Sequence, residues 1–131
     1  LQVEDLFRHN GFKASYNPSE KSNVLSHGGE CVAARAYLNT KPVPTDVPDA
    51  IEKCINCKLR FAVRIVRFQD LEVLFISPYF WCSENFSERN QTILKQMSMV
   101  SRVIGLPMIA IGDFNITWQQ FETPIGLQFS K

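Results

Sequence analysis

Hydrophobic and polar positions alternate most clearly in the middle of the chain. From Arg60 to Phe68, every second residue is apolar over most of the run, and Leu71 to Tyr79 is a second apolar run rich in β-branched residues. A short polar turn, Gln69-Asp70, joins the two runs. Two β-type runs with a two-residue connection are typical of a hairpin, so we predict one over residues 60–79.

The period changes to a helical one after the hairpin. Ser87 is a favourable N-cap residue, and Gly105 is a favourable residue just beyond a C-terminus. Between them, apolar residues recur at a spacing that places them on one helix face: Ile93, Leu94, Met97, Val100 and Ile104. The pattern predicts a helix that ends at about Ile104.

A short apolar run follows this helix. Residues 107–111 are apolar at both alternating positions, which predicts a strand covered on both faces. Gly112 closes the strand, and the lack of a side chain there would permit a tight bend or a close approach of substrate. A polar loop with a short helical turn at Trp118-Gln119-Gln120-Phe121 is expected next.

The first part of the chain gives weaker signals. A helix is expected over Gln2–Asn10, with Gly11 ending it, and a loop over Asn17–Asn23. Cys31–Leu38 resembles a strand, and residues 39–49 contain three prolines, which favours a connection without regular structure. The order of elements is that of an α/β chain with mixed strand pairing.

Composition narrows the class of protein without identifying it. The 131 residues are 45% apolar and 21% charged, which fits one globular domain. The net charge of +1 neither supports nor excludes a nucleic-acid partner. No charged-then-apolar leader appears, and no apolar run approaches the roughly 18 residues of a membrane span. The low density of cysteines favours free thiols in a reducing compartment, so an intracellular location is expected.

The segment Gly112-Asp113-Phe114-Asn115 is the strongest candidate for chemistry. In extended backbone, Asp113 and Asn115 point to one side and Phe114 to the other, where it is expected to anchor the segment in the core. A carboxylate can bind a metal or orient water, and an amide N–H can donate to a phosphate oxygen. The alternative is that both polar residues are simply turn formers after a strand, because both types favour turns.

The neighbouring segments make a family resemblance specific. Gly105-Leu106-Pro107, the apolar strand and Gly-Asp-Phe-Asn together resemble the endonuclease/exonuclease/phosphatase superfamily, whose domain is deoxyribonuclease-I-like. Residues 73–79, which end in Tyr79, look like the strand that carries that family's site tyrosine. Residues 27–33 resemble its Gly-Gly strand entry. These matches occur in the family's order over nearly the whole chain.

The resemblance implies a fold and a site. The fold would be α/β (α+β): a four-layer sandwich of two mixed β-sheets flanked by helices, only partly present here. Asp113 would orient or deprotonate the attacking water and would bind Mg²⁺ or Mn²⁺. Asn115 would stabilise the pentavalent phosphate, and Tyr79 would contact or position it, although an aromatic residue at a strand end is more often simply packed.

The resemblance also implies a function, with alternatives. It points to a metal-dependent phosphodiesterase, and foremost to a nuclease that hydrolyses nucleic acid by in-line water attack. The alternatives are a phosphatase or phospholipid or inositol-phosphate hydrolase of the same superfamily, and a degenerate module that binds phosphate without catalysis.

Parts of the family's pattern are missing. The family supplies an upstream metal-binding Asn and Glu and a C-terminal Ser-Asp-His segment, and the only histidines here, His9 and His27, match neither position. We therefore expect residues 1–131 to be an interior part of such a domain, inactive on its own.

Two other features have competing interpretations. Cys54-x-x-Cys57 has the spacing of half a zinc site, but Cys31 and Cys82 do not supply a matching second pair, so free thiols are expected. The basic residues around the hairpin form either a rim that faces a polyanion or an ordinary solvated face. They are Lys53, Lys58, Arg60, Arg64 and Arg67.

Overall fold

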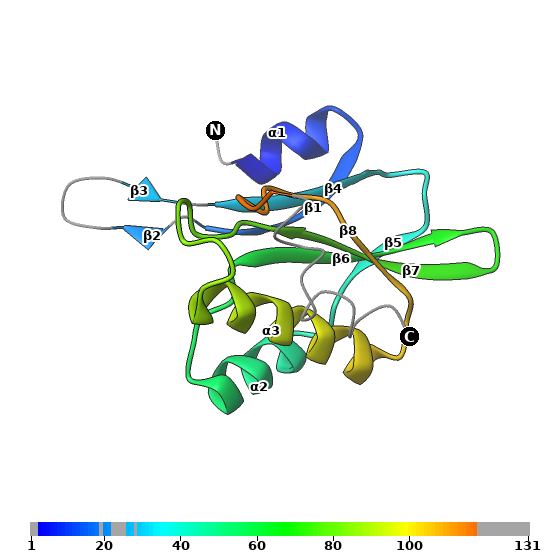
Figure 1. The fold of residues 1–131 in the computed structure, drawn as a ribbon. Helices are drawn as coiled ribbons and strands as arrows, with labels where there is room; N and C mark the ends of the chain where they lie inside the picture. Colours follow the sequence, from blue (N-terminus) through cyan, green and yellow to red (C-terminus); the bar gives the residue numbers. More distant parts are fainter. Residues whose placement is uncertain (1–2, 19, 22–25, 28, 118–131) are drawn as a thin grey trace.

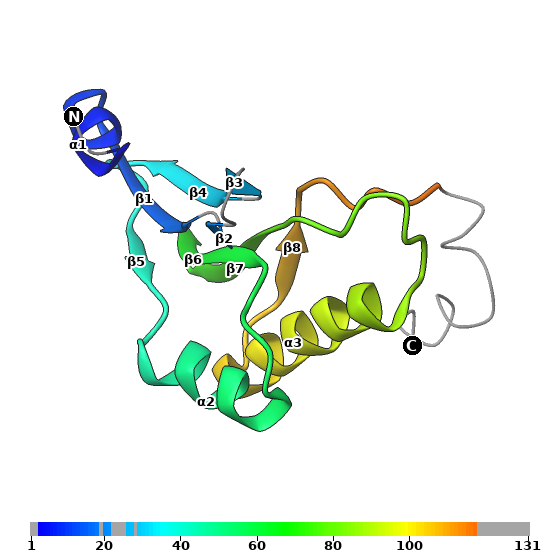
Figure 2. The same ribbon diagram turned by 90° about the vertical axis from the view of Figure 1, so that its left-hand side faces the viewer.

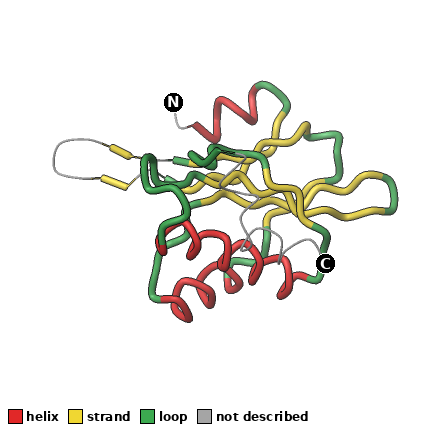
Figure 3. The backbone as a smooth tube through the Cα atoms, viewed as in Figure 1, coloured by secondary structure: helices red, strands yellow, loops and turns green. Residues whose placement is uncertain are grey.

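The chain folds into an α/β sandwich, as the sequence predicts. The computed structural model describes residues 3–18, 20–21, 26–27 and 29–117. A four-stranded sheet faces a two-stranded sheet. Two helices, α2 and α3, cover the far side of the larger sheet, and α1 lies beside the smaller one (Figures 1 and 2). Figure 3 shows the strands gathered between these helices. No helix in the described ranges is long and apolar enough to cross a membrane.

The larger sheet contains the predicted hairpin. Its strand order is β5 (Thr40–Pro42), β6 (Phe61–Phe68), β7 (Leu71–Pro78) and β8 (Met108–Ala110). β6 and β7 pair antiparallel along their whole length, and Gln69 takes a left-handed conformation (φ 53°) in the turn between them. β7 and β8 are parallel, because α3 carries the chain back to the other end of the sheet.

The smaller sheet is built from the first third of the chain. Helix α1 (Val3–His9) ends before Gly11, whose φ of 74° is a conformation that glycine adopts readily. β1 (Phe12–Asn17) then pairs antiparallel with β4 (Glu30–Arg35). The helix and the second strand were both predicted, although the strand ends three residues earlier than expected.

The predicted loop over residues 17–23 is only partly a loop. β2 (Glu20–Lys21) pairs with β3 (Ser26–His27), and this short ribbon projects on the side of the fold opposite the β6–β7 turn (Figure 1). The expected helical turn at residues 118–121 lies outside the described residues.

The expectation of an irregular connection over residues 39–49 is wrong. It contains β5 and the start of helix α2 (Asp46–Ile55). The helix is compatible with Pro48 because proline in a first helical turn removes an N–H that has no partner within the helix. Val47 and Ile51 are buried on one face, four residues apart. The prolines therefore mark the edges of short elements and do not exclude them.

Helix α3 (Glu88–Ile104) agrees with the prediction at both ends. The Ser87 hydroxyl accepts a hydrogen bond from the Asn90 N–H at 3.3 Å, and Gly105 ends the helix with φ 71°. Its apolar face packs against β6 and β7 together with α2. The fully enclosed members of this core include Leu74, Ile76, Phe80, Ile93, Met97 and Val100.

The strand predicted to be covered on both faces is instead at the sheet edge. Met108 and Ile109 in β8 remain 39% and 43% exposed, and Ile111 just beyond it is 67% exposed. β8 pairs with β7 on one side, and no described strand lies on its other side. The apolar residues of β8 therefore form a surface that the described part of the chain does not cover.

Candidate active site

The predicted site residues Asp113 and Tyr79 meet where β7 and β8 end. The two residues form a parallel β-bridge that extends the pairing of these strands. The Asp113 N–H donates to the Pro78 carbonyl at 3.1 Å, and the Phe80 N–H donates to the Asp113 carbonyl at 2.9 Å. The backbone thus fixes the position from which the exposed Asp113 side chain projects.

Gly112 permits the close approach of these two strand ends. A Cβ atom at this position would lie 2.2 Å from the Pro78 carbonyl oxygen and 2.6 Å from its Cδ. Both distances are far below an ordinary contact of about 3.5 Å. The sequence suggested that glycine permits a tight bend or a close approach of substrate; the group that approaches it is the neighbouring strand.

Asn115 is positioned by a turn and not by strand alternation. Its φ is 47°, and its N–H donates to Oδ1 of Asp113 at 3.0 Å, which is the geometry of an Asx turn. The turn interpretation is therefore correct for the backbone. The Asn115 side chain is nevertheless ordered at the site, because Nδ2 donates to the Phe80 carbonyl at 2.8 Å.

Phe114 anchors this turn, as predicted. Its ring lies 5.2 Å from that of the fully buried Phe80 in an edge-to-face arrangement. Tertiary packing and two hydrogen bonds therefore hold Asp113 and Asn115 together at the strand ends.

The Tyr79 hydroxyl contacts a cysteine next to the site. It lies 3.7 Å from the Cys82 sulfur. This hydrogen bond is the main reason that the Tyr79 pKa is raised, and the electrostatic effect of Cys82, desolvation and the charge of Asp113 act in the same direction. Arg60 opposes the shift. A phenol with a raised pKa remains a hydrogen-bond donor at neutral pH.

A buried arginine beside Tyr79 was not identified as a site residue from the sequence. Arg60 is only 6% exposed, its Nε donates to the Tyr79 carbonyl at 3.3 Å, and its guanidinium lies 5.2 Å from the Tyr79 ring centroid. Glu30 faces it from β4. Burial raises the Glu30 pKa, and the positive charge of Arg60 partly opposes that shift. The sequence signal that could have identified this pair is a charged residue at the start of each of two strands. Glu30 begins β4, and Arg60 directly precedes β6.

The basic residues near the hairpin do not form one surface. Arg60 and Arg64 are both buried, whereas Lys53, Lys58 and Arg67 are exposed. Arg64 donates to Thr40 Oγ1 in the neighbouring strand β5 at 2.8 Å, and to Ser15 Oγ in β1 of the smaller sheet at 2.9 Å. Burial lowers the Arg64 pKa. The sequence allowed either a rim that faces a polyanion or a solvated face, and neither describes the buried Arg60 and Arg64.

The described residues do not by themselves make a complete metal site. They contain no group of three or more His, Cys, Asp or Glu side chains that is able to hold an ion. Asp113 presents one exposed carboxylate, and Mg²⁺ in proteins is often bound by one or two carboxylates with water and phosphate oxygens. Cys54 and Cys57 are exposed at the end of α2, and all four cysteines are unpaired.

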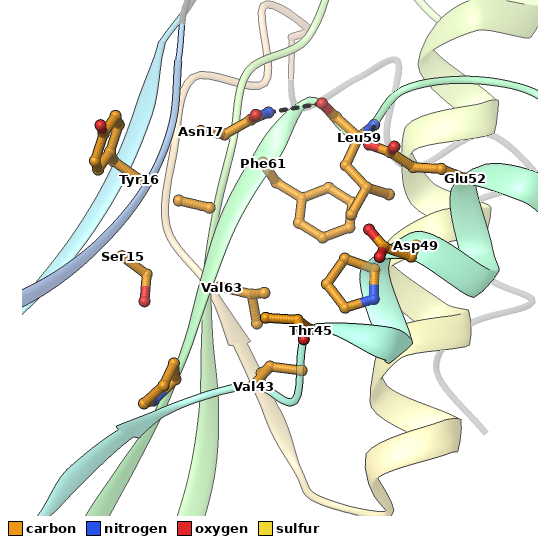
Figure 4. A pocket seen from close by; sticks show the side chains of 13 residues that line it. Ser15, Tyr16, Asn17, Val43, Thr45, Asp49, Glu52, Leu59, Phe61 and Val63 are labelled. Atoms are coloured by element: carbon orange, nitrogen blue, oxygen red, sulfur yellow. Dashed lines mark hydrogen bonds between the residues drawn. The ribbon is translucent and has the colours of Figure 1, made fainter.

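A cavity elsewhere in the fold does not contain the predicted residues. It has a volume of about 280 Å³ and lies between β1 and α2 (Figure 4). Asn17 on its wall donates to the Leu59 carbonyl at 2.7 Å. Tyr79, Asp113 and Asn115 are absent from its lining. The candidate site is thus an exposed strand edge and not part of this cavity.

Comparison with known proteins supports the fold. No family model matches the chain, and no curated protein matches it. Among solved structures, the endonuclease domain of TRAS1, a telomere-specific non-LTR retrotransposon, superimposes with a TM-score of 0.54 and 17% sequence identity. The match covers 89% of this chain and 49% of that domain. The chain thus has a nuclease-like fold and spans about half the length of the domain that it matches.

Proposed function

We propose that this chain is part of a metal-dependent phosphodiesterase of the endonuclease/exonuclease/phosphatase superfamily, and that its substrate is nucleic acid. The pairing of Tyr79 with Asp113 at the ends of two parallel strands carries the proposal, because it brings a carboxylate and a phenol to one sheet edge. The fold that the chain shares with the endonuclease domain of TRAS1 supports it.

Each residue has a role that its contacts allow. One oxygen of the Asp113 carboxylate accepts from the Asn115 N–H, which leaves the other oxygen to orient a water molecule and to take its proton. The attacking water oxygen forms a bond to phosphorus while the bond to the leaving oxygen breaks. That oxygen departs with the electron pair and takes a proton from solvent.

Asn115 and Tyr79 would stabilise the negative charge that develops on the non-bridging phosphate oxygens. Nδ2 of Asn115 carries two N–H groups, and the one that donates to Phe80 fixes the direction of the other. The protonated Tyr79 hydroxyl is a second donor. Fixed donors aimed at developing charge are effective because they need no reorganisation during the reaction.

In an intact domain, Mg²⁺ or Mn²⁺ would neutralise charge on the phosphate, with Asp113 as one of its ligands. The remaining ligands would be water, phosphate oxygens and groups outside the described residues. We expect residues 1–131 alone to be inactive, because the described residues do not supply the remaining metal ligands.

Asp113→Asn in the full-length protein tests the proposal. Asparagine keeps an oxygen that can accept from the Asn115 N–H, so the turn is preserved while the carboxylate charge is lost. We expect nicking of supercoiled DNA in Mg²⁺ to fall by about 10²-fold to 10⁴-fold, the usual contribution of a general base. Asp113→Ala should show the same loss, with an added effect on the turn.

The matched control is Asp70→Asn, in the exposed turn between β6 and β7, away from the site. It should cleave at the wild-type rate. Near-normal Mg²⁺-dependent cleavage by Asp113→Asn would refute the site assignment. A wild-type protein that binds DNA but does not cleave it would favour the non-catalytic binding module, and cleavage confined to small phosphate esters would favour the phosphatase alternative.

A further inference from the structure

A tryptophan flanked by two arginines lies directly beside the candidate site. The Arg60 guanidinium carbon is 3.7 Å from the centroid of the Trp81 ring, and that of Arg89 is 3.6 Å from it. The two arginines differ in exposure. Arg60 is buried, whereas the Arg89 side chain is 57% exposed. Arg60 therefore supports the ring from within, and Arg89 presents a cation to solvent on a half-buried indole.

This arrangement is continuous with the residues proposed for catalysis. Trp81 follows Phe80, whose carbonyl holds the Asn115 side chain, and Arg60 contacts the rings of both Tyr79 and Trp81. We call Tyr79, Trp81 and Arg89 the Trp81 strip. A ligand at Asp113 that extends along the strip would meet a phenol, an indole and a guanidinium in turn.

The loop that carries the strip is held by a buried asparagine. Asn90 is fully enclosed, and its Oδ1 accepts a hydrogen bond from the backbone N–H of Trp81 at 2.8 Å. Its Nδ2 donates to the carbonyls of Trp81 at 3.2 Å and Asn85 at 2.7 Å. A loop fixed in this way loses little conformational entropy when a ligand binds, so contacts along it contribute more of their energy to affinity.

Arg89 retains donors for an anion. One of its nitrogens pairs with Oε1 of Glu84 at 2.9 Å, and a guanidinium has five N–H donors in all. A phosphate matches the planar donor geometry of arginine. The two guanidinium groups cover both faces of the Trp81 ring, so a base would stack on the outer face of the exposed Arg89 guanidinium. The combination fits a polymer with alternating phosphates and bases better than it fits a compact phosphate ester.

We propose that the Trp81 strip binds the backbone of a nucleic-acid strand next to the phosphate on which Asp113 acts. The proposal rests on the proposed function and deepens it, because it assigns contacts that only an extended substrate can make. Arg89 binds one flanking phosphate through its N–H groups, and the outer face of its guanidinium, which lies on the Trp81 ring, stacks on an adjacent base. The strip thereby distinguishes a polynucleotide from an inositol phosphate or a simple monoester.

Arg89→Gln in the full-length protein tests the inference, because the residue is exposed and its replacement leaves the core unchanged. Binding of a fluorescent single-stranded oligonucleotide is measured by anisotropy in EDTA, where metal-dependent cleavage cannot occur, over a range of salt concentrations. We expect affinity to fall about fivefold to tenfold and the salt dependence to weaken by about one phosphate contact. Hydrolysis of bis(p-nitrophenyl) phosphate should not change.

The matched control is Arg102→Gln, an exposed arginine in the last turn of the same helix. It makes the same change in net charge at the other end of α3 and should bind as the wild type does. Trp81→Phe should reduce binding less than Arg89→Gln does, because phenylalanine keeps a ring on which the Arg89 guanidinium can lie.

Equal oligonucleotide affinity for Arg89→Gln and the wild type would overturn the inference. Equal losses on the oligonucleotide and on the small diester would also overturn it, because the residue would then act on the reaction and not on an extended strand. If Asp113→Asn abolishes cleavage while Arg89→Gln binds normally, the proposed function stands and the strip assignment fails. If Arg89→Gln weakens binding while Asp113→Asn still cleaves, the catalytic assignment fails instead.

Discussion

Gly112 allows a direct test of how the two strand ends hold the site. In Gly112→Ala, the new Cβ would lie 2.2 Å from the Pro78 carbonyl oxygen. Relief to an ordinary contact of about 3.5 Å requires the strands to separate by about 1 Å. The obstacle is backbone, which cannot rotate away as a flexible side chain can.

The cost follows from the bonds that this separation breaks. The bonds from Asp113 N to Pro78 O (3.1 Å) and from Phe80 N to Asp113 O (2.9 Å) would stretch beyond bonding distance. Two backbone hydrogen bonds contribute about 1 kcal/mol each. Overpacking adds about 1–3 kcal/mol. We expect Gly112→Ala to lower the free energy of unfolding by about 3–5 kcal/mol in total.

Urea unfolding measures this difference, and Gly105→Ala is the matched control. Gly105 has φ 71°, but a Cβ added there would meet no atom within 4 Å, so its substitution introduces only backbone strain. That strain costs about 1 kcal/mol. If Gly112→Ala costs no more than Gly105→Ala, the close packing of Gly112 on Pro78 does not determine the position of Asp113.

Two further predictions concern residues behind the site. Asn90→Ala removes three hydrogen bonds that hold the loop after β7 and should destabilise the protein by about 3 kcal/mol; thermal unfolding checks this, and Thr92→Ala on the same helix should cost far less. Arg60→Met should raise the Glu30 pKa further, because Arg60 opposes the effect of burial. The stability that protonated Glu30 contributes is present below its ordinary pKa of 4.5 and is lost as the pH rises through the raised pKa. Because the pKa of Glu30 is raised further in Arg60→Met, this variant should lose more stability than the wild type between acidic and neutral pH. An NMR titration in which the Glu30 pKa is unchanged in Arg60→Met would contradict this account.

Local patterns in the sequence were sufficient to predict the central hairpin, helix α3 and both of its ends. The period of 2 over residues 60–79 and the pair Ser87 and Gly105 are local signals, and local conformation follows them. The same is true of Phe114, which packs inward as its neighbours predict. The identity of the candidate segment, Asp113 to Asn115, was likewise readable from its position after an apolar strand.

Tertiary structure decided the rest, because those features depend on residues far apart in the chain. Helix α2 was missed because its buried face is only evident once it packs beside α3. The exposure of β8 depends on which strands flank it, and the burial of Arg60 depends on Glu30, which lies thirty positions earlier. Asn115 is directed by the Phe80 carbonyl and not by strand alternation. The sequence alone therefore determined which residues are candidates, and long-range packing determined which of them meet at one sheet edge.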